Sequence, residues 1–369
     1  MKIALAHDFL AFLGGAEKVL SRIHEIWPSS PIYVLFYNKE KVKELFDDKK
    51  INIKTSLLQN IPFSKRFYRL LMPLMPNFIE RFNLSNYDIV ISSSTAYAKG
   101  VLTRPETLHI CYCHTPTRYL WQDTHDYVRN LPYPDIIKKV IPFGLTYLRL
   151  WDGLASGRVD KFIANSRAVQ DRIRKYYRKE ADVIYPPVDT KSFKISQDTE
   201  DYFLLVGRMR HHKRVDLAIR AFNKLKLPLK VIGDGPDLSK FRKMANKNIE
   251  FLGWLPQNKL KEYYSKCLAL LHPQEEDFGI VPLEAMASGR PVIAYSKGGA
   301  LETVVENVTG NFFHEQTPSA LTQAVRDFHP ENFDPQVLRN RAAKFDVEVF
   351  KRRMKEYVEK AWREFNEHK

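Results

Sequence analysis

The chain has 369 residues, of which 44% are hydrophobic, and a formal net charge of +15. This length suits about two domains of roughly 150 residues each. Three cysteines are too few for a disulfide framework, which favours a reducing compartment such as the cytosol. Met1–Phe9 lacks the character of a secretory signal, and no apolar run has the length of a membrane span, so we expect neither.

The large positive charge suggests an anionic partner. Nucleic acid, an anionic lipid surface and small anions such as nucleotide sugars all fit it. Charge alone does not choose among these three classes.

Strands alternate with helices through the first half of the chain, which predicts a parallel, doubly wound sheet. The predicted strands are Lys2–His7, Ile32–Phe36, Ile51–Thr55, Tyr87–Ser92, Leu108–Cys113 and Asp160–Ala164. The predicted helices are Ala16–Trp27, Lys39–Asp48, Asp135–Gly157 and Arg167–Tyr177, the last one capped by Ser166.

The same alternation begins again after Pro186-Pro187, so a second doubly wound domain is predicted, joined to the first near Pro186–Thr190. Its strands are Tyr202–Val206, Leu229–Ile232, Ile249–Leu252, Leu268–Leu271 and Pro291–Ala294, and its helices are Val215–Leu225, Lys259–Ser265 and Pro318–Phe328. From Asp346 an apolar stripe at helical spacing predicts a helix that faces a core, at Phe350, Met354, Tyr357, Val358, Ala361 and Phe365.

The stretch Pro273–Ala294 compresses an acidic turn, a short helix and a strand. Pro282 suits the first helical position, and Gly289 suits the residue after the end of the helix. This places Glu276 on a loop and Glu284 in the first helical turn, with helix N–H groups between them that can hold an anion such as phosphate. Because carboxylates repel phosphate, we expect the two glutamates to face sugar or ribose hydroxyls.

Basic residues follow the first strand of the second domain. In an open α/β sheet ligands bind beyond the carboxyl ends of the strands, so Arg208, which follows Gly207, and Lys213 should point at the same crevice as Glu276. A guanidinium and an ammonium together suit a diphosphate and stabilise negative charge on it if it leaves. The alternative, which charge alone favours, is a solvated basic loop, because further cations stand beside them at Arg210, His211 and Arg214.

Two other loops of the second domain carry weaker signals. Gly233 and Gly235 follow a strand as in a dinucleotide fingerprint, but the third glycine is absent and a plain turn is the preferred interpretation. Trp254-Leu255 also follows a strand, and its backbone could bond the edge of a base.

In the first domain the loop Gly14-Gly15 would let a phosphate or sugar approach closely, although a structural turn is the simpler explanation. His114 follows a strand and is a candidate for substrate contact, with a plain loop histidine as the alternative. Cys111, Cys113 and His114 have no second ligand cluster in the sequence, so no metal site is expected.

Several of these stretches resemble one family. PQEEDFGIVPLEAMASGRPVIA is similar to the signature of the retaining GT-B glycosyltransferases of glycosyltransferase family 4, with its paired glutamates at Glu276 and Glu284. VGRMRHHKRVDLAIRAF resembles the diphosphate-binding segment of that family. GGAEKVL, KFIANSRAV, VIGDGP, FLGW and GGALETV occur in the expected order, so the resemblance covers nearly the whole chain.

The resemblance implies an α/β GT-B fold with two Rossmann-like domains facing a central cleft. Residues 1–187 would form the acceptor-side domain, 188–345 the nucleotide-sugar-binding domain, and 346–369 a helix crossing back to the first domain. It also implies sugar transfer with retention of anomeric configuration, without a metal ion and without a cofactor other than the donor substrate. The family is usually assigned a front-face route in which the leaving phosphate assists the acceptor hydroxyl.

The family's residue roles carry over position by position. Arg208 and Lys213 would bind the diphosphate, Glu284 the ribose and Glu276 the donor sugar, while Gly15 would approach the donor phosphate and His114 the transferred sugar. The implied catalytic set is therefore Arg208, Lys213, Glu276 and His114. The implied donor-binding set is Gly14, Gly15, Gly207, Arg208, Lys213, Gly233, Trp254, Leu255, Glu276, Phe278, Gly279, Ile280, Val281 and Glu284. One departure is Ser265-Lys266-Cys267, where many members carry an aspartate before the strand.

The stretch CYCHTPTRYLW most resembles bacterial O-antigen and surface-polysaccharide mannosyltransferases. This subgroup implies transfer of mannose from GDP-mannose to a glycan acceptor linked to undecaprenyl diphosphate. The enzyme would then be cytoplasmic and peripheral on the inner face of the cell membrane. The alternatives are a UDP-sugar donor, a phosphorylase or epimerase of the same fold, and a basic nucleic-acid-binding protein, against which no nucleic-acid-binding motif appears.

A basic and aromatic stretch, Ile61–Leu84, has two interpretations. One is a patch that docks on an anionic membrane, where a lipid-linked acceptor would be found. The other is a partly buried segment whose cations extend to solvent.

Overall fold

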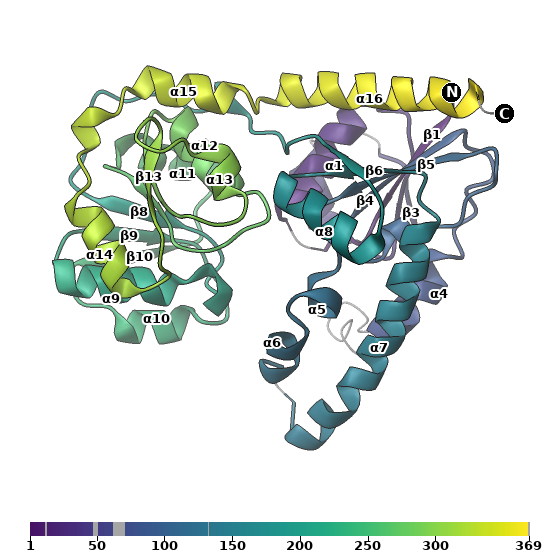
Figure 1. The fold of residues 1–369 in the computed structure, drawn as a ribbon, viewed down its shortest axis with the longest axis horizontal. Coiled ribbons are helices and arrows are strands. Elements are labelled where there is room, and N and C mark those ends of the chain that lie inside the picture. Colours follow the sequence, from purple (N-terminus) through teal and green to yellow (C-terminus); the bar gives the residue numbers. More distant parts are fainter. Residues whose placement is uncertain (12, 47–50, 62–70, 132, 368–369) are drawn as a thin grey trace. The chain divides into compact units, whose positions relative to one another are not determined.

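The computed structural model describes residues 1–11, 13–46, 51–61, 71–131 and 133–367. Its contacts divide the chain into two compact units. Unit 1 comprises Met1–Tyr185 together with Lys351–Lys369, and unit 2 comprises Pro186–Phe350. In each unit helices cover a twisted sheet (Figure 1).

Seven parallel strands form the sheet within the described part of unit 1, in the order β3-β2-β1-β4-β5-β6-β7. The central strands are buried at every position, which explains their continuous apolar runs. The strands are β1 (Ile3–His7), β2 (Ile32–Val34), β3 (Ile53–Thr55), β4 (Ile89–Ser94), β5 (Leu108–Cys113), β6 (Lys161–Ala164) and β7 (Ala181–Val183).

The helices of unit 1 include one long element, α7 (Asp135–Gly157), whose bounds agree with the prediction. The other helices are α1 (Gly15–Ile26), α2 (Lys39–Phe46), α4 (Met75–Ile79), α5 (Arg118–Trp121), α6 (Thr124–Arg129) and α8 (Arg167–Tyr177). The predicted cap of α8 is confirmed, because the Ser166 hydroxyl accepts the Val169 N–H at 3.2 Å.

A buried ion pair anchors α7 in unit 1. Lys99 Nζ lies 2.5 Å from Asp152 Oδ1, and both side chains are almost fully buried. The other Asp152 oxygen accepts hydrogen bonds from Trp121 Nε1 and Tyr177 Oη, each at 2.8 Å. The tryptophan that ends CYCHTPTRYLW therefore has a structural role, which joins α5 to α7.

Unit 2 has the same architecture with six parallel strands among its described residues, ordered β10-β9-β8-β11-β12-β13. In both units the strand order reverses beside the first strand, as in a Rossmann-like sheet. The strands are β8 (Phe203–Val206), β9 (Leu229–Ile232), β10 (Ile249–Gly253), β11 (Leu270–His272), β12 (Val292–Tyr295) and β13 (Gly310–Phe313). The helices are α9 (Val215–Leu225), α10 (Leu238–Met244), α11 (Gln257–Lys266), α12 (Ile280–Ala287), α13 (Ala300–Thr303), α14 (Pro318–Arg326) and α15 (Pro335–Ala343).

The last helix, α16 (Val347–Glu367), follows α15, and from Lys351 onward its contacts group it with unit 1. The predicted stripe faces a core, because Phe350, Met354, Val358 and Ala361 are buried. The α/β class and the two Rossmann-like sheets agree with the sequence prediction.

Residues 62–70 of the stretch Ile61–Leu84 lie outside the described residues, so its basic cluster has no structural account. The described remainder belongs to the core of unit 1, where Met72, Met75, Ile79 and Leu84 are buried. None of the helices in the described ranges is both long enough and apolar enough to cross a membrane.

Candidate functional site

The carboxyl edge of the unit 2 sheet gathers most of the predicted site residues. Arg208 follows β8, Gly233 follows β9, Trp254 follows β10, and Glu276 lies in the loop after β11. Because these four strands are parallel neighbours, their following loops share one edge of the sheet. The loops that carry these residues therefore lie together at the edge where the sequence analysis expects a ligand crevice.

An ion pair joins the two sequence candidates Lys213 and Glu276. Lys213 Nζ donates to Glu276 Oε1, and the side chains are 23% and 19% exposed. Gln274 Nε2 donates to the same oxygen at 2.9 Å. Burial opposes ionisation of Glu276, but the charge of Lys213, with smaller contributions from His272 and Gln274, outweighs it and lowers the pKa of Glu276 to about 2. Lys213 is therefore held in place by Glu276, in contrast to the solvated basic loop that charge alone favoured.

A buried histidine beneath Glu276 was missed by the sequence analysis. His272 ends β11, and its Nδ1 lies 3.1 Å from Gln274 Nε2. Burial, with Lys213 nearby, lowers the pKa of His272 to about 4, so the ring is neutral at pH 7. Its Nε2 has no hydrogen-bond partner among the described residues, and a Cβ on Gly279 would stand 3.4 Å from it. The imidazole therefore lies under the start of α12.

The helix α12 begins at Ile280, two residues earlier than predicted, after Gly279 with φ of 88°. Pro282 is thus the third helical residue and not the first. A proline is still tolerated there, because the first N–H groups of a helix have no intrahelical partner. Glu284 consequently falls in the second turn. The predicted end is confirmed, since the helix stops at Ala287 before Gly289.

Glu284 is fixed from the neighbouring helix. Its side chain is buried, and Tyr264 Oη of α11 donates a hydrogen bond to Oε2 at 2.8 Å. Tyr264 was another residue that the sequence analysis did not single out. Its pKa is raised well above its ordinary value by burial and by the Glu284 carboxylate, so the hydroxyl keeps its proton and remains a donor.

Two glycines allow close backbone contacts that position the site. The loops after β8 and β9 approach closely at Gly233. Any larger residue there would place its Cβ 1.9 Å from the carbonyl oxygen of Gly207 and force the loops apart. A Cβ on Gly298 would lie 2.3 Å from the carbonyl oxygen of Glu276, which also accepts the Gly299 N–H at 2.9 Å. The paired glycines of GGALETV therefore fix the backbone of Glu276.

The remaining unit 2 candidates differ in exposure. Arg208 and Trp254 are exposed at the sheet edge, and Leu255 is half-buried beside them. Phe278 is a core residue whose ring lies 5.7 Å from that of Phe345, so only its backbone faces the loop. Arg214 donates to Gln316 and has a structural role.

A second polar cluster lies at the carboxyl edge of the unit 1 sheet, where β1, β4 and β5 end side by side. Ser93 Oγ lies 2.9 Å from His114 Nε2 and 3.2 Å from His7 Nδ1. His7 Nε2 in turn lies 4.0 Å from Glu17 Oε1. Ser93, His7 and Glu17 were not predicted as site residues.

The two histidines of this cluster differ in charge. Burial, helped by His7, lowers the pKa of His114 to about 3, so that ring is neutral at pH 7. Burial also opposes a charge on His7, but Glu17 and Asp8 outweigh it and raise the pKa of His7 above its ordinary value. Gly14 precedes α1, and a Cβ there would lie 2.8 Å from Glu17 Oε2, so the Gly14-Gly15 loop adjoins a carboxylate.

A hollow of about 300 Å³ lies beside this cluster at the same edge. Its walls are mostly apolar and aromatic, with one cation: Phe9, Met72, Met75, Thr95, Ala96, Tyr97, Thr115, Arg118, Tyr119 and Tyr127. Asp8 fixes one wall, because its carboxylate accepts five hydrogen bonds of 2.6–2.9 Å from residues 95–98.

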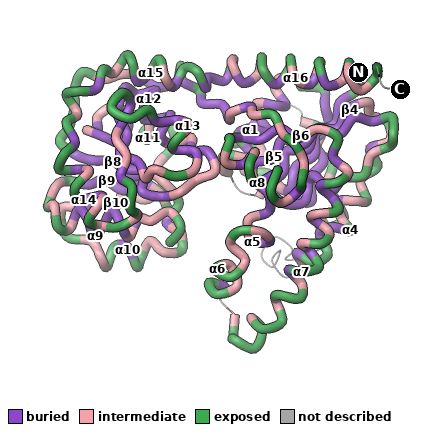
Figure 2. Tube along the Cα trace, viewed as in Figure 1, coloured by how far each residue is buried: buried purple, intermediate pink, exposed green. Residues whose placement is uncertain are grey.

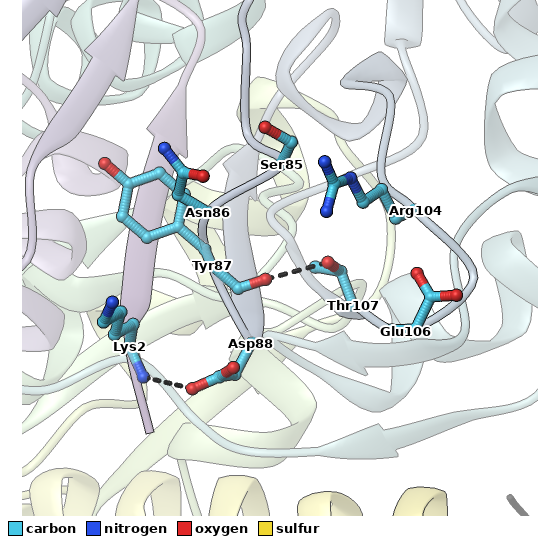
Figure 3. A pocket seen from close by; sticks show the side chains of 8 residues that line it. All are labelled: Lys2, Ser85, Asn86, Tyr87, Asp88, Arg104, Glu106 and Thr107. Atoms are coloured by element: carbon cyan, nitrogen blue, oxygen red, sulfur yellow. Dashed lines mark hydrogen bonds between the residues drawn. The ribbon is translucent and has the colours of Figure 1, made fainter.

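Another hollow, of about 560 Å³, opens at the opposite edge of the unit 1 sheet (Figure 3). It is lined by Lys2, Asp88 and Thr107, which precede β1, β4 and β5, and Lys2 N donates to Asp88 Oδ2 at 2.6 Å. Because ligands of open α/β sheets bind at the carboxyl ends of strands, we do not assign the functional site to this hollow.

Within the described ranges no group of three or more His, Cys, Asp or Glu side chains is arranged to hold a metal ion. Cys111, Cys113 and Cys267 are free and buried. Burial raises the pKa of Cys267 to about 12, so that thiol is not ionised.

Two family models match the chain. The model described as Glycosyltransferase Family 4 matches residues 13–192, and that of Glycosyl transferases group 1 matches residues 188–345. The alpha-1,3/1,6-mannosyltransferase ALG2 of Mus musculus is 26% identical over 282 residues, which are 66% of this chain and 65% of that protein. The O-antigen chain mannosyltransferase RfbU of Salmonella typhimurium is 32% identical over 207 residues, 50% of this chain and 55% of that protein.

Among the first curated relatives, the chain spans between 36% and 65% of their length. The solved structure of Anabaena Alr3699/HepE in complex with UDP has a TM-score of 0.72 at 18% identity, and the match covers 98% of this chain and 100% of that one. The two models together match residues 13–345, and the chain has the GT-B fold of the group 1 and family 4 glycosyltransferases.

Proposed function

We propose that the protein is a retaining mannosyltransferase that moves mannose from GDP-mannose to a lipid-linked glycan acceptor in surface-polysaccharide synthesis. The observation that carries the proposal is the pairing of Lys213 with Glu276 at the carboxyl edge of unit 2, beside the N-terminus of α12. A cation, a carboxylate and helix N–H groups together match a sugar diphosphate, which presents hydroxyls and negative charge.

Donor binding rearranges this pair. The diphosphate takes Lys213 away from Glu276 and also receives Arg208 and the first amides of α12. Glu276, ionised because its pKa is about 2, then accepts hydrogen bonds from sugar hydroxyls. Glu284, which Tyr264 holds at 2.8 Å, accepts those of the ribose. No metal ion is required, because Arg208 and Lys213 neutralise the leaving diphosphate.

The transfer step forms a bond from the acceptor oxygen to the anomeric carbon and breaks the bond from that carbon to the phosphate oxygen. The acceptor proton passes to the leaving phosphate, and GDP is released. Retention follows when attack and departure occur on the same face of the sugar. His114 is neutral because its pKa is about 3, and it contributes a hydrogen bond to the transferred sugar and not a positive charge.

The choice of mannose rests on the relatives, of which ALG2 and RfbU are described as mannosyltransferases. A UDP-sugar donor is the second candidate, since HepE was solved in complexes with UDP and with UDP-glucose. The apolar hollow of unit 1 suits part of a lipid-linked acceptor, and Arg118 on its wall suits a phosphate. The enzyme would then work peripherally on the inner face of the cell membrane.

Thermal unfolding with GDP, UDP and ADP tests the donor. The nucleotide that binds raises the unfolding midpoint, and the rise grows with nucleotide concentration. At a concentration one hundred times Kd, binding adds about 2.7 kcal/mol to the free energy of unfolding. A rise with GDP alone supports the proposal, and a rise with UDP alone supports the second candidate. Mass spectrometry of products then separates transfer from nucleotide sugar, which lengthens a glycan, from phosphorolysis or epimerisation. The absence of any extended glycan with all three classes of nucleotide sugar would refute the transferase proposal.

A further inference from the structure

One face of α7 carries a continuous apolar stripe that is exposed. Its members follow one another at intervals of four and three residues: Ile136, Val140, Phe143, Tyr147, Leu150 and Leu154. Each of the six is between 49% and 77% exposed. At a rise of 1.5 Å per residue the stripe is about 27 Å long. Figure 2 shows exposed positions along α7, in contrast to the buried strands of the same unit.

The stripe is not needed to hold α7 in place. The opposite face of the helix carries the buried residues Leu145, Leu148 and Asp152, the last of them in the ion pair with Lys99. Arg149 Nε also donates to the backbone oxygen of Leu120 in α5 at 2.6 Å. With one face anchored, the apolar residues of the other face remain exposed among the described residues of unit 1. Apolar patches of this extent mark docking surfaces.

We propose that this stripe docks unit 1 on an anionic membrane surface. The charge of the chain selects that occupant, because unit 1 has 35 Lys and Arg against 22 Asp and Glu, a formal charge of +13, whereas unit 2 has 23 against 21, or +2. A second copy seated on the stripe would bring two units of +13 together, which repel each other. An anionic bilayer attracts the same charge and accepts the apolar side chains below its headgroups.

The surroundings of α7 agree with a lipid surface. Lys139 flanks the amino-terminal part of the stripe, where its long stem can follow apolar surface while the ammonium group reaches headgroups. The neighbouring Lys138 Nζ donates to the backbone oxygen of Arg129 in α6 at 3.0 Å. The helix α6 lies beside α7 and contributes Tyr127 to the apolar hollow of unit 1 (Figure 1). The helix α6 therefore contacts α7, which carries the docking surface, and also lines the hollow proposed for the lipid-linked acceptor.

The proposal concerns binding to lipid and does not depend on the donor or on transfer. It is tested with vesicles of phosphatidylcholine, with and without about a third phosphatidylglycerol, that hold neither donor nor acceptor. A failure of membrane docking and a failure of the proposed transferase activity are then separate results.

Depth in the membrane can be measured with one dye. Because the three natural cysteines are buried, Phe143→Cys offers a single accessible thiol for an environment-sensitive fluorophore. We expect a blue shift of its emission on anionic vesicles, a weaker one on neutral vesicles, and no shift for a dye on Leu57→Cys. Leu57 is another exposed apolar residue of unit 1, outside α7. Equal emission with and without vesicles at position 143 would overturn the proposal.

Co-sedimentation tests the contribution to affinity. We expect Phe143→Glu/Leu150→Glu to lower the partition onto anionic vesicles at least about tenfold, because two inserted apolar groups are replaced by charges that anionic lipid repels. The control Leu57→Glu/Leu102→Glu adds the same charge elsewhere on unit 1 and should lower it less than about twofold. Equal effects of the two variants would refute the assignment. Another result would also refute it: the wild-type protein does not bind vesicles but is a dimer in light scattering, and Phe143→Glu/Leu150→Glu dissociates that dimer. The stripe would then join two copies of the chain.

Discussion

The exchange of partners at Lys213 predicts an unusual gain of affinity. In the free protein Lys213 bonds to Glu276, and the diphosphate must displace that carboxylate. Burial opposes the charge on Glu276, yet Lys213 and its neighbours lower the pKa from 4.5 to about 2. A shift of that size corresponds to roughly 3 kcal/mol. Glu276→Gln removes the competing charge while keeping the shape of the side chain. We expect GDP, which lacks the transferred sugar, to bind about tenfold tighter, or ~1.4 kcal/mol, roughly half of the released interaction.

The same substitution should have the opposite effect on the complete donor. A glutamine cannot accept sugar hydroxyls as strongly as a carboxylate, so kcat/KM with GDP-mannose should fall by about 100-fold. Titration calorimetry with GDP and initial rates with GDP-mannose measure the two effects. Glu262→Gln serves as control, since it removes the same charge from an exposed position on α11. Unchanged or weaker GDP binding in Glu276→Gln would show that Lys213 does not exchange between carboxylate and diphosphate.

Four further predictions follow from single side chains. Arg208→Ala should lower kcat by about 100-fold or more with a smaller effect on KM, because it stabilises the departing diphosphate; an unchanged kcat would contradict its role. Glu284→Ala should weaken GDP by about 10- to 100-fold in calorimetry through the lost ribose contact, and equal affinity would exclude that contact. Asp152→Ala leaves Lys99 buried without its partner and should cost about 3–5 kcal/mol in urea unfolding of unit 1. His114 has a pKa of about 3 in the folded protein and near 6.5 in the unfolded chain, so between these pH values only the unfolded chain binds the proton. The free energy of unfolding should therefore fall as the pH drops below about 6.5. Thermal midpoints between pH 8 and 5 should fall less in His114→Gln, and equal declines would contradict this.

Local sequence patterns were sufficient for the fold. The strand β5 and the helices α7 and α9 have the predicted bounds, because their apolar spacing fills a whole strand or repeats over several turns. The strand β4 lies two residues later than the predicted Tyr87–Ser92. Shorter elements were missed. The strand β13, with the sequence GNFF, begins with glycine and asparagine, and α10 has one buried residue and therefore almost no apolar period.

The candidate site was predictable where one stretch carries its residues, and not where distant residues meet. The acidic turn revealed Glu276 and Glu284 because both stand beside a helix start. Nothing local marked His272 or Tyr264, which matter only because β11 and α11 bring them under that turn. Ser93 likewise gains its role from being placed between two histidines on neighbouring strands.

The five hydrogen bonds that Asp8 accepts have a consequence for selectivity. They hold Thr95, Ala96 and Tyr97 in one arrangement, and these residues form a wall of the apolar hollow in unit 1. His7 and these bonds also keep the pKa of Asp8 below its ordinary value against the effect of burial, so the carboxylate stays ionised. Binding of a ligand in the hollow has little entropic cost from ordering this wall, because the wall is already ordered. Discrimination among ligands there should therefore depend on how well each one fits a rigid shape.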